Sequence, residues 1–421
     1  MHILVLTDRF LPEIAAPSFR VMEHAQHWIE EGHQVTVVTC APNFPEGKLF
    51  PGYQNRFYHI EWMEGVQVVR VWSYMTANVG TVKRILDYVS FMFMSVLFSF
   101  RFPAFDLILA TSPPLFVALA GYLIAKIRRK PWIFEIRDLW PGSVKAVGIS
   151  QSPLLRLFEK LEVFLYRKAD RIVSLSPAFE EDLVARGIER DKQDVVTNGV
   201  NTSFFSNANI RYDVRKKLNV DPDHFLCGYI GTVGLAHGLK TLLDAADHCR
   251  EQPGIVFLIL GNGADRMALE RMSKERGLKN IIFHDFVPHE EVPSYLAALD
   301  VSIVHLKPHP LFKTVIPSKI FESMAMGTRI LCCVEGIAAQ IVRENAAGIC
   351  IPPGDSSAMA RAIIEMKQDM SRNGYNAQAV REIVGQKYSR ESKAAEMLIT
   401  FSRILDPKSR VSERTSLNRI S

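Results

Sequence analysis

The chain has 421 residues, of which 48% are hydrophobic and 23% are charged, and its formal net charge is +5. This length allows two or three domains and the apolar content is enough for their cores, so an intrinsically disordered protein is excluded. The excess of 50 Lys and Arg over 45 Asp and Glu is small for this length. The strong basicity typical of nucleic-acid-binding proteins is absent, and we expect no nucleic-acid partner.

The six cysteines are scattered along the chain, and no two of them stand at the Cys-x-x-Cys spacing of metal and redox motifs. The sequence therefore predicts neither disulfides nor a structural zinc site, and it favours a reducing, cytoplasmic compartment. Residues 1–6 are apolar but too few for the core of a signal peptide, and they run directly into Asp8 and Arg9. We expect them to contribute the first β-strand.

Short apolar runs alternate with helical patterns in the first half of the chain. A helical pattern over residues 18–31 ends at Gly32, a residue that commonly terminates helices. Near-continuous apolar strands separated by helices are typical of a parallel sheet that is covered on both faces. We expect strands at residues 3–7, 34–40, 66–72, 107–111, 132–136 and 171–175.

The same pattern restarts after a polar, irregular stretch at residues 207–223, and helices are expected again over 371–405. Two successive series predict an α/β protein with two doubly wound, Rossmann-like domains that face each other across a cleft. Ligands of such domains bind at the carboxyl ends of the strands. The second set of strands is expected at residues 225–230, 255–260, 281–283, 301–304 and 329–334. The predicted divisions are domains at 1–205 and 206–388, a C-terminal helix at 389–406 that packs back on the first domain, and a basic flexible tail at 407–421.

Residues 88–100 form an uncharged run that is rich in Phe and Met. The run is shorter than the roughly 20 residues that a helix needs to cross a bilayer, so it does not predict a transmembrane span. Basic residues flank it at Lys83, Arg84 and Arg101, and more follow within residues 126–130. Two interpretations stay open: a buried helix of the first domain, or a membrane-facing segment over 82–101 that lies in a bilayer interface as a helix or hairpin.

Glycines follow two predicted strands of the second series. One strand leads into Gly231-Thr232-Val233-Gly234-Leu235-Ala236-His237-Gly238, and the next leads into Gly261-Asn262-Gly263. Glycines between a strand and a helix let backbone N–H groups approach a phosphate at the positive end of the helix dipole. Because the spacing matches neither the Rossmann fingerprint nor a P-loop, a purely structural turn remains an alternative.

A polar cluster opens a predicted helix at Pro317-Ser318-Lys319-Ile320-Phe321-Glu322. Pro317 suits the first helical turn, Ser318 offers a hydroxyl and an N–H group, and Lys319 adds a cation for a phosphate. Glu322 lies one turn later, where it can accept hydrogen bonds from a ribose diol. The alternative is a capped surface helix with an i, i+3 Lys–Glu pair.

In their order and spacing, these pieces resemble the retaining GT-B glycosyltransferases of family 4, and the resemblance extends from Met1 to about Phe401. Within that family the chain is most similar to the WbuB-like L-fucosaminyltransferases of O-antigen, capsule and colanic acid biosynthesis, which build lipopolysaccharide and exopolysaccharide. The similarity to this group is carried by residues 8–21, 137–141 and 316–322. The wider resemblance is carried by residues 8–12, 32–39, 197–201, 231, 238, 261–263 and 317–327.

The resemblance implies that the first domain binds the acceptor and the second binds a nucleotide-sugar donor, with no metal or other cofactor. Glu322 would bind the ribose, the N–H groups around Ser318 and Lys319 would hold the diphosphate, and the base would lie near residues 285–287. Asp138 and Lys319 are the implied catalytic residues, and Arg20 and Arg137 lie on the acceptor and sugar side. The implied donor-binding residues are Gly231, Thr232, His237, Gly261, Asn262, Phe286, Val287, Ser318, Lys319 and Glu322.

The chain departs from the family pattern at several positions. Thr232 and His237 stand where the family usually carries two cations for the diphosphate, so Lys319 or Arg20 would have to supply the charge. Thr314 stands where the first of two paired glutamates is expected, which leaves Glu322 alone. Residues 15–16 are alanines where two glycines often occur in the family. Their methyl groups leave less room for the backbone of this loop to approach a ligand.

The implied reaction transfers a sugar with retention, by front-side displacement, from a UDP-linked hexose or N-acetyl-deoxyhexosamine such as UDP-L-FucNAc. The implied acceptor is a saccharide on undecaprenyl diphosphate, with the enzyme bound peripherally at the inner face of the cytoplasmic membrane. A helix N-terminus and cations can stabilise the leaving diphosphate without a metal. Asp221-Pro222-Asp223 imitates a metal-binding DxD motif, but it precedes the first strand of its domain. Two alternatives remain: a non-catalytic nucleotide-sugar-binding subunit and a sugar-nucleotide epimerase of the same fold.

Overall fold

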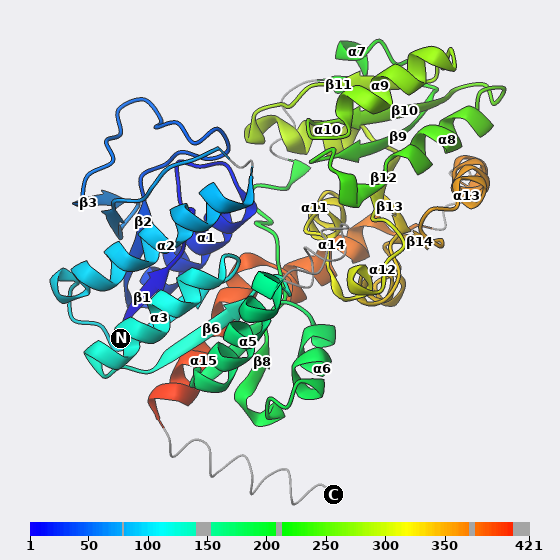
Figure 1. The fold of residues 1–421 in the computed structure, drawn as a ribbon. Helices are drawn as coiled ribbons and strands as arrows, with labels where there is room; N and C mark the ends of the chain where they lie inside the picture. Colours follow the sequence, from blue (N-terminus) through cyan, green and yellow to red (C-terminus); the bar gives the residue numbers. More distant parts are fainter. Residues whose placement is uncertain (78–79, 140–152, 208–212, 370–374, 407–421) are drawn as a thin grey trace, which may run out of the picture. The chain divides into compact units, whose positions relative to one another are not determined.

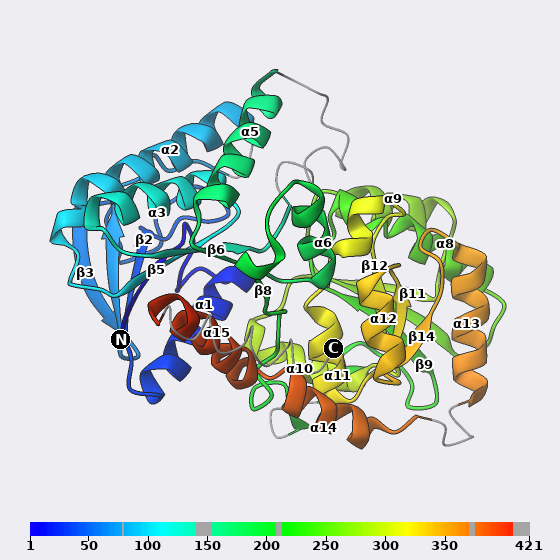
Figure 2. The same ribbon diagram turned by 90° about the horizontal axis from the view of Figure 1, so that it is seen from below.

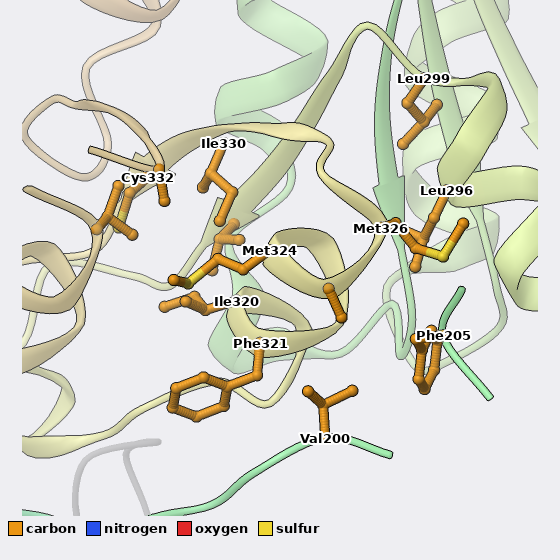
Figure 3. Close-up of a cluster of buried hydrophobic side chains, with 14 of the residues drawn as sticks. Val200, Phe205, Leu296, Leu299, Ile320, Phe321, Met324, Met326, Ile330 and Cys332 are labelled. Atoms are coloured by element: carbon orange, nitrogen blue, oxygen red, sulfur yellow. The ribbon is translucent and has the colours of Figure 1, made fainter. Parts of the chain in front are cut away.

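The computed structural model describes residues 1–77, 80–139, 153–207, 213–369 and 375–406. The chain divides into two compact units, one of Met1–Thr197 with Arg390–Ser421 and one of Asn198–Ser389. The boundary predicted at 205/206 therefore falls inside the second unit. The reason is that Val200 and Phe205, which come before the predicted boundary, are buried in the core of the second unit (Figure 3). The predicted tail at 407–421 lies outside the described residues.

The first unit is built on a sheet whose described strands have the order β3-β4-β2-β1-β5-β6-β7-β8. All neighbouring strands pair in parallel except β3 and β4, which are antiparallel. The strands are β1 (His2–Leu6), β2 (Gln34–Cys40), β3 (Tyr58–Met63), β4 (Val66–Val71), β5 (Leu107–Thr111), β6 (Trp132–Ile136), β7 (Arg171–Ser174) and β8 (Gln193–Val195).

The sequence predicts six of these strands to within one residue at each end, and it misses β3 and β8. The strand β3 lies at the edge of the sheet and carries polar residues such as His59 and Glu61, so it lacks a continuous apolar run. The strand β8 has only 3 residues. Edge and very short strands bury little surface and leave a weak pattern, whereas the buried central strands are nearly continuous apolar runs.

Helices cover both faces of this sheet. On one face α2 packs against α3, and on the other α1 packs against α15 (Figure 1 and Figure 2). The indole N–H of Trp28 on α1 donates a 3.0 Å hydrogen bond to the carbonyl of Ala394, and the Trp28 ring meets the Phe401 ring edge-on at 5.1 Å. Through these contacts the last described helix completes the core of the first unit. The helices are α1 (Ala16–Glu30), α2 (Thr81–Leu97), η1 (Phe98–Arg101), α3 (Leu115–Arg128), α5 (Pro153–Lys168), α6 (Pro177–Ala185), η2 (Arg190–Lys192) and α15 (Arg390–Leu405).

The uncharged run at residues 88–100 is helical and belongs to α2 and η1. It is buried on one face, where Phe91 is 1% exposed, and open on the other, where Phe93 is 61% exposed. The interpretation as a buried helix therefore holds for one side of α2 only, and the hairpin alternative is wrong. Within the described ranges, no helix is long and apolar enough to cross a membrane.

The second unit contains a parallel sheet with the described strand order β11-β10-β9-β12-β13-β14. The five strands expected from the sequence are present to within one residue, and the 3-residue β14 was not predicted. Together the two sheets confirm an α/β protein with two Rossmann-like domains. The strands are β9 (Phe225–Ile230), β10 (Ile255–Leu260), β11 (Ile281–His284), β12 (Val301–His305), β13 (Arg329–Cys333) and β14 (Gly348–Cys350).

Two apolar clusters fill the two sides of the second sheet. On one side α11 inserts Ile320, Phe321 and Met324, as Figure 3 shows. These buried residues fix the helix, so the polar residues of its first turn are held at the carboxyl ends of the strands. The helices are α7 (Val214–Lys217), η4 (Leu235–His237), α8 (Lys240–His248), α9 (Arg266–Glu275), η5 (His289–Glu291), α10 (Val292–Ala298), η6 (Pro310–Thr314), α11 (Lys319–Met326), α12 (Ile337–Glu344), α13 (Ser356–Asp369) and α14 (Ala377–Lys387).

Candidate functional site

Two glycine-containing loops meet at the carboxyl ends of β9 and β10. Gly261 has a φ of 133°, and a Cβ placed there would lie 2.0 Å from the carbonyl oxygen of Gly231. Gly231 has a φ of 137°, and a Cβ there would lie 3.1 Å from the ammonium nitrogen of Lys319. Both positions therefore favour glycine for their backbone conformation, and Gly261 also requires it for space. The Val233 N–H also donates to the carbonyl of Asn262 at 2.9 Å, which ties the two loops together.

Lys319 is the first residue of α11, and its side chain reaches the Gly231 loop. Its ammonium nitrogen is shielded from solvent and has no hydrogen-bond partner among the described residues. It lies 3.6 Å from the centroid of the Tyr229 ring, so a cation–π contact compensates part of the lost hydration. Burial lowers the Lys319 pKa to about 7, although the nearby Glu322 carboxylate acts in the opposite direction. A buried, unpaired ammonium group is costly unless a ligand pairs with it.

His237 lies beside Lys319, in the loop after β9. Its Nδ1 atom is buried without a hydrogen-bond partner in the described part of the chain. Burial, and next the charge of Lys319, lower the His237 pKa to about 4, so the imidazole is neutral at physiological pH. The ring of His305 fixes the loop: its Nδ1 donates to the His237 carbonyl at 2.6 Å, and its Nε2 accepts from the Gly354 N–H.

We call Lys319, His237, Tyr229 and Gly231 the Lys319 cluster. It contains a cation and a buried imidazole nitrogen that both lack partners in the described chain. The cluster lies at the N-terminus of α11, where the helix dipole favours anions. The N–H groups of Ile320, Phe321 and Glu322 already donate to the carbonyls of Pro317 and Ser318. A cation at a helix N-terminus beside a glycine-containing loop suits a phosphate or diphosphate.

The structure brings most of the predicted donor-binding residues into this part of the second unit. Ser318 is the N-cap residue of α11, and Glu322 occupies the first turn of the same helix. After β11, Phe286 is 62% exposed whereas Val287 is buried, so the phenyl ring is available for stacking on a base. The remaining predicted donor-binding residues follow β9 and β10. The Thr232 carbonyl accepts a hydrogen bond from the Tyr229 hydroxyl, and Asn262 is exposed.

Three residues that position these loops were not predicted. Tyr229 lies under the Lys319 ammonium, His305 holds the His237 loop, and Arg266 donates from one guanidinium nitrogen to the carbonyls of Gly261 and His284. Tyr229 and His305 occupy ordinary strand positions, and Arg266 begins α9. Their spacing in the sequence gives no signal, because their roles depend on loops that meet only in the fold.

Arg20, which the sequence offers as a replacement cation, is already paired within the first unit. It is 2% exposed, and its guanidinium pairs with the Glu135 carboxylate at 3.0 Å. Further hydrogen bonds go to the carbonyls of Val196 and Thr197. This guanidinium therefore ties α1 to β6 and to the end of the first unit, which is a structural role.

Arg137 and Asp138 directly follow β6. Arg137 donates from Nε to the carbonyl of Ser112 at 2.6 Å, and burial lowers its pKa while Glu135 and Asp8 oppose that shift. Asp138 is partly buried at the carboxyl end of the strand. Both residues thus occupy the loop position at which ligands of such sheets bind. The rest of the predicted 137–141 motif, from Trp140, lies outside the described residues.

No group of three or more His, Cys, Asp or Glu residues in the described ranges could hold a metal ion. In the DxD-like sequence, Asp221 lies 3.5 Å from the His224 ring, and both aspartates are exposed. The pair precedes β9 at the amino end of the sheet, opposite to the glycine loops.

Two family models match the chain. The glycosyl transferase 4-like domain matches residues 16–199, and the glycosyl transferases group 1 family matches residues 211–381, so each match falls almost entirely within one structural unit. Sucrose-phosphate synthase from Thermosynechococcus elongatus aligns with a TM-score of 0.77 at 19% identity, over 96% of this chain and 98% of that chain. The chain is a GT-B glycosyltransferase. Its two units are the two domains of that fold, and its family is the group 1, type 4-like one.

Several proteins are similar to this glycosyltransferase over most of their length. The Escherichia coli (strain K12) protein named as the colanic acid biosynthesis glycosyl transferase WcaI is 26% identical over 80% of this chain and 84% of its own length. A GDP-mannose-dependent alpha-mannosyltransferase of Mycobacterium tuberculosis is 23% identical over 92% of this chain and 93% of its own. The structure of Anabaena HepE in complex with UDP-glucose has a TM-score of 0.71 at 18% identity, over 96% of this chain and 99% of that one.

Proposed function

We propose that this glycosyltransferase transfers a sugar from a nucleotide-sugar donor to a lipid-linked saccharide during the synthesis of a bacterial surface polysaccharide. The donor we favour is a UDP-linked hexose or N-acetyl-deoxyhexosamine, such as the UDP-L-FucNAc of WbuB-like enzymes. The proposal draws on the similarity to WcaI and on the UDP-glucose complex of HepE. Because the chain is also similar to a GDP-mannose-dependent enzyme, the nucleotide of the donor has to be identified by experiment.

The buried, unpaired ammonium of Lys319 is the observation that carries the donor part of this proposal. A donor diphosphate would supply the missing anionic partner beside the Gly231 loop, against which the Lys319 ammonium lies. In the same site the Glu322 carboxylate would accept hydrogen bonds from the ribose, and Phe286 would stack on the base. This arrangement would neutralise the negative charge that develops on the departing nucleoside diphosphate, which is a large term in catalysis.

For the chemical step we propose front-side displacement with retention. In this mechanism the leaving phosphate oxygen accepts the proton of the acceptor hydroxyl, and Asp138 orients that hydroxyl. Charge stabilisation would come from Lys319 and the first turn of α11, without a metal. Arg137 would help to hold Asp138 in place, because its Nε is itself fixed on the Ser112 carbonyl.

The lipid-linked acceptor is supported by the outer face of α2. Val82, Leu86, Phe93 and Leu97 are all more than half exposed, and their helical spacing places them on one side of the helix. The opposite side carries the buried Phe91. An apolar stripe that faces away from the core is typical of a helix that lies in a membrane interface.

The edge strand β3 extends this apolar surface. The ring of Tyr58 lies 5.4 Å from that of Phe98, so β3 and the end of α2 are adjacent. Ile60 and Trp62 lie on the same face of the strand as Tyr58, and Trp62 is 67% exposed. Aromatic side chains with a polar edge are enriched at bilayer interfaces.

Basic residues border the same surface and would attract anionic lipid. Arg128, at the end of α3, donates a hydrogen bond to the Ser99 carbonyl of η1, and Lys126 and Arg129 beside it are exposed. Lys83 is exposed at the other end of α2. We therefore propose that the enzyme binds peripherally to the inner face of the cytoplasmic membrane.

Titration with UDP tests the donor site. Lys319→Met removes the charge but keeps the length of the side chain, and we expect UDP affinity to fall about 10- to 100-fold, the range for a charge-assisted hydrogen bond. Lys313→Ala is the matched control, because Lys313 is an exposed cation that pairs with Glu335 at 2.9 Å. Equal affinities of the two variants would disprove the donor assignment.

Flotation with vesicles that contain anionic lipid tests the membrane surface. Phe93→Asp places a charge in the apolar stripe of α2. We expect this variant to remain in the unbound fraction rather than to float with the vesicles. The control is Met267→Asp on α9 of the second unit, where the methionine is 82% exposed. If the wild-type enzyme fails to float, or if both variants lose binding alike, the membrane proposal is wrong.

A further inference from the structure

Two cysteines face each other across neighbouring strands of the second unit. Cys332 in β13 and Cys350 in β14 are direct partners in the parallel register. Neighbouring strands lie about 4.7–4.9 Å apart, which falls within the ~4.4–6.8 Å that separates the Cα atoms of a disulfide. Cys332 belongs to the apolar cluster that contains Ile320 and Phe321, and Cys350 packs against that cluster. The two side chains therefore point to the same side of the sheet.

The two thiols differ in exposure. The chain has six cysteines, all of them within the described residues and all of them free thiols. Five are buried, and Cys350 is the one that is partly exposed. Cys332 lies behind it and is 0% exposed. A small molecule in the solvent therefore reaches the sulfur of Cys350 first.

The surroundings of Cys350 favour its thiolate form. A hydrogen bond from the Cys332 thiol lowers the pKa of Cys350; burial opposes this shift, and the nearby charge of Arg343 supports it. The same hydrogen bond, together with burial, raises the pKa of Cys332. Because the thiolate is the nucleophilic form of cysteine, the outer sulfur is suited to attack and the inner one keeps its proton.

Little in the described structure holds the two sulfur atoms apart. The Cys350 sulfur lies 3.5 Å from the Ala339 carbonyl oxygen, and the Cys332 sulfur lies 3.6 Å from that of Val334. A thiol is a weak donor, so either contact is given up at small cost. The strand β14 has 3 residues and lies at the edge of the sheet, where it has a neighbouring strand on one side only. Cys350 can therefore adjust its position toward β13.

The buried cysteines of the same unit show a different arrangement. Cys333 follows Cys332 directly but points to the other side of the sheet, into the cluster that also contains Cys227 and Cys249. Burial raises the pKa of Cys333, and all three residues are 0% exposed. Buried free cysteines commonly serve as small apolar side chains, and that role fits these three. It does not explain a partly exposed thiol that is hydrogen-bonded to a second thiol.

We propose that Cys332 and Cys350 form a reversible disulfide when the protein meets a hydroperoxide. The Cys350 sulfur attacks one oxygen of hydrogen peroxide, the O–O bond breaks, and the departing hydroxide takes up the thiol proton and leaves as water. The Cys332 sulfur then attacks the resulting sulfenic acid, the S–O bond breaks, and the hydroxide leaves with the Cys332 proton as a second water. A dithiol reductant restores both thiols by thiol–disulfide exchange.

The disulfide would protect the exposed thiol from permanent damage. A sulfenic acid that finds no neighbouring thiol is open to further oxidation to sulfinic acid, which a dithiol does not reverse. Cys332 would intercept the sulfenic acid of Cys350 before that step. In reducing compartments protein disulfides are usually transient and redox-sensing, and a bond that forms and opens in this way belongs to that class.

Peptide mapping of the full-length, native protein tests this assignment. After brief treatment with hydrogen peroxide, alkylation of the remaining thiols and digestion with trypsin, we expect peptide 330–343 to be joined to peptide 344–361. Fragmentation of the joined peptides should place the bond at Cys332 rather than at Cys333. The treated protein should lose two of its six titratable thiols, and dithiothreitol should restore both.

Two variants complete the test. Cys332→Ala should form no such bond and should accumulate sulfinic acid at Cys350 at the same peroxide dose. Cys333→Ala is the matched control on the same strand and should keep the bond. Six unreacted thiols in the treated wild-type protein, a bond to Cys333, or sulfinic acid at Cys350 without a bond would each disprove the proposal. Because these three outcomes concern the wild-type protein, they decide the matter even if a variant does not fold.

Discussion

The low pKa of Lys319 predicts that donor binding depends on pH. In the free protein this pKa is about 7, because the ammonium is buried without an anionic ligand. A bound diphosphate favours the charged form and raises the pKa in the complex. The affinity should therefore be highest below pH 7, where Lys319 is already protonated, and should fall as the pH rises and protonation must accompany binding.

The size of the effect follows from linkage. Above the pKa of the free protein, each pH unit weakens binding about tenfold, or ~1.4 kcal/mol. Between pH 6 and pH 9 the affinity should thus fall on the order of 100-fold, or ~2.7 kcal/mol. The neighbouring titratable groups do not change charge in this range, because the His237 pKa is about 4, burial keeps the His305 pKa low, and burial raises the Tyr229 pKa above its usual value.

Calorimetric titration with UDP-glucose is the appropriate assay, because both phosphates of this ligand are diesters that stay ionised between pH 6 and pH 9. Wild-type enzyme should show the decline, whereas Lys319→Met should bind weakly at every pH. Lys319→Arg keeps its charge throughout and should lose the pH dependence without losing most of the affinity. An affinity of the wild-type enzyme that stays constant from pH 6 to pH 9 would refute this reasoning.

Three further predictions concern stability and loop geometry. Without nucleotide, Lys319→Met should raise the free energy of unfolding in urea at pH 7 by about 1–3 kcal/mol, since it removes a buried unpaired charge; a loss of stability would point to a structural role for the lysine. Arg20→Met should lower that free energy by about 3–5 kcal/mol, because it strands the buried Glu135 carboxylate, while UDP affinity should stay within about twofold of wild type. A large loss of UDP affinity in a folded Arg20→Met variant would restore Arg20 as a ligand. Gly261→Ala should weaken UDP binding and cost about 1–3 kcal/mol in stability, because the new methyl group would meet the Gly231 carbonyl; wild-type behaviour in both measurements would contradict the described loop contact.

The central strands were predictable from the sequence because burial on both faces leaves a run of apolar residues with no polar interruption. The edge strand β3 was not, since its exposed face can carry Glu61 and His59 without cost. The apolar helix within residues 82–101 could be located from the sequence, but the sequence did not show which side of it is buried and which is exposed. That distinction depends on α3 and on the sheet against which it packs.

The glycine loops and the start of α11 were predictable because their chemistry is local. Gly231, Gly261 and Lys319 each stand next to a strand end or a helix start, where the chain alone determines the geometry. The pairing of Arg20 could not be predicted, because its partner, Glu135, is 115 positions away in the chain.

The packing of α15 on α1 affects how the protein folds during synthesis. Trp28 is made near the beginning of translation, but its partners Ala394 and Phe401 are made almost at the end, after the whole second unit. The ribosome therefore releases the second unit before the first can be completed, which reverses the usual N-terminal-first order. A nascent chain that stalls before residue 390 would lack α15, so Trp28 of its first unit would stay exposed and prone to aggregate.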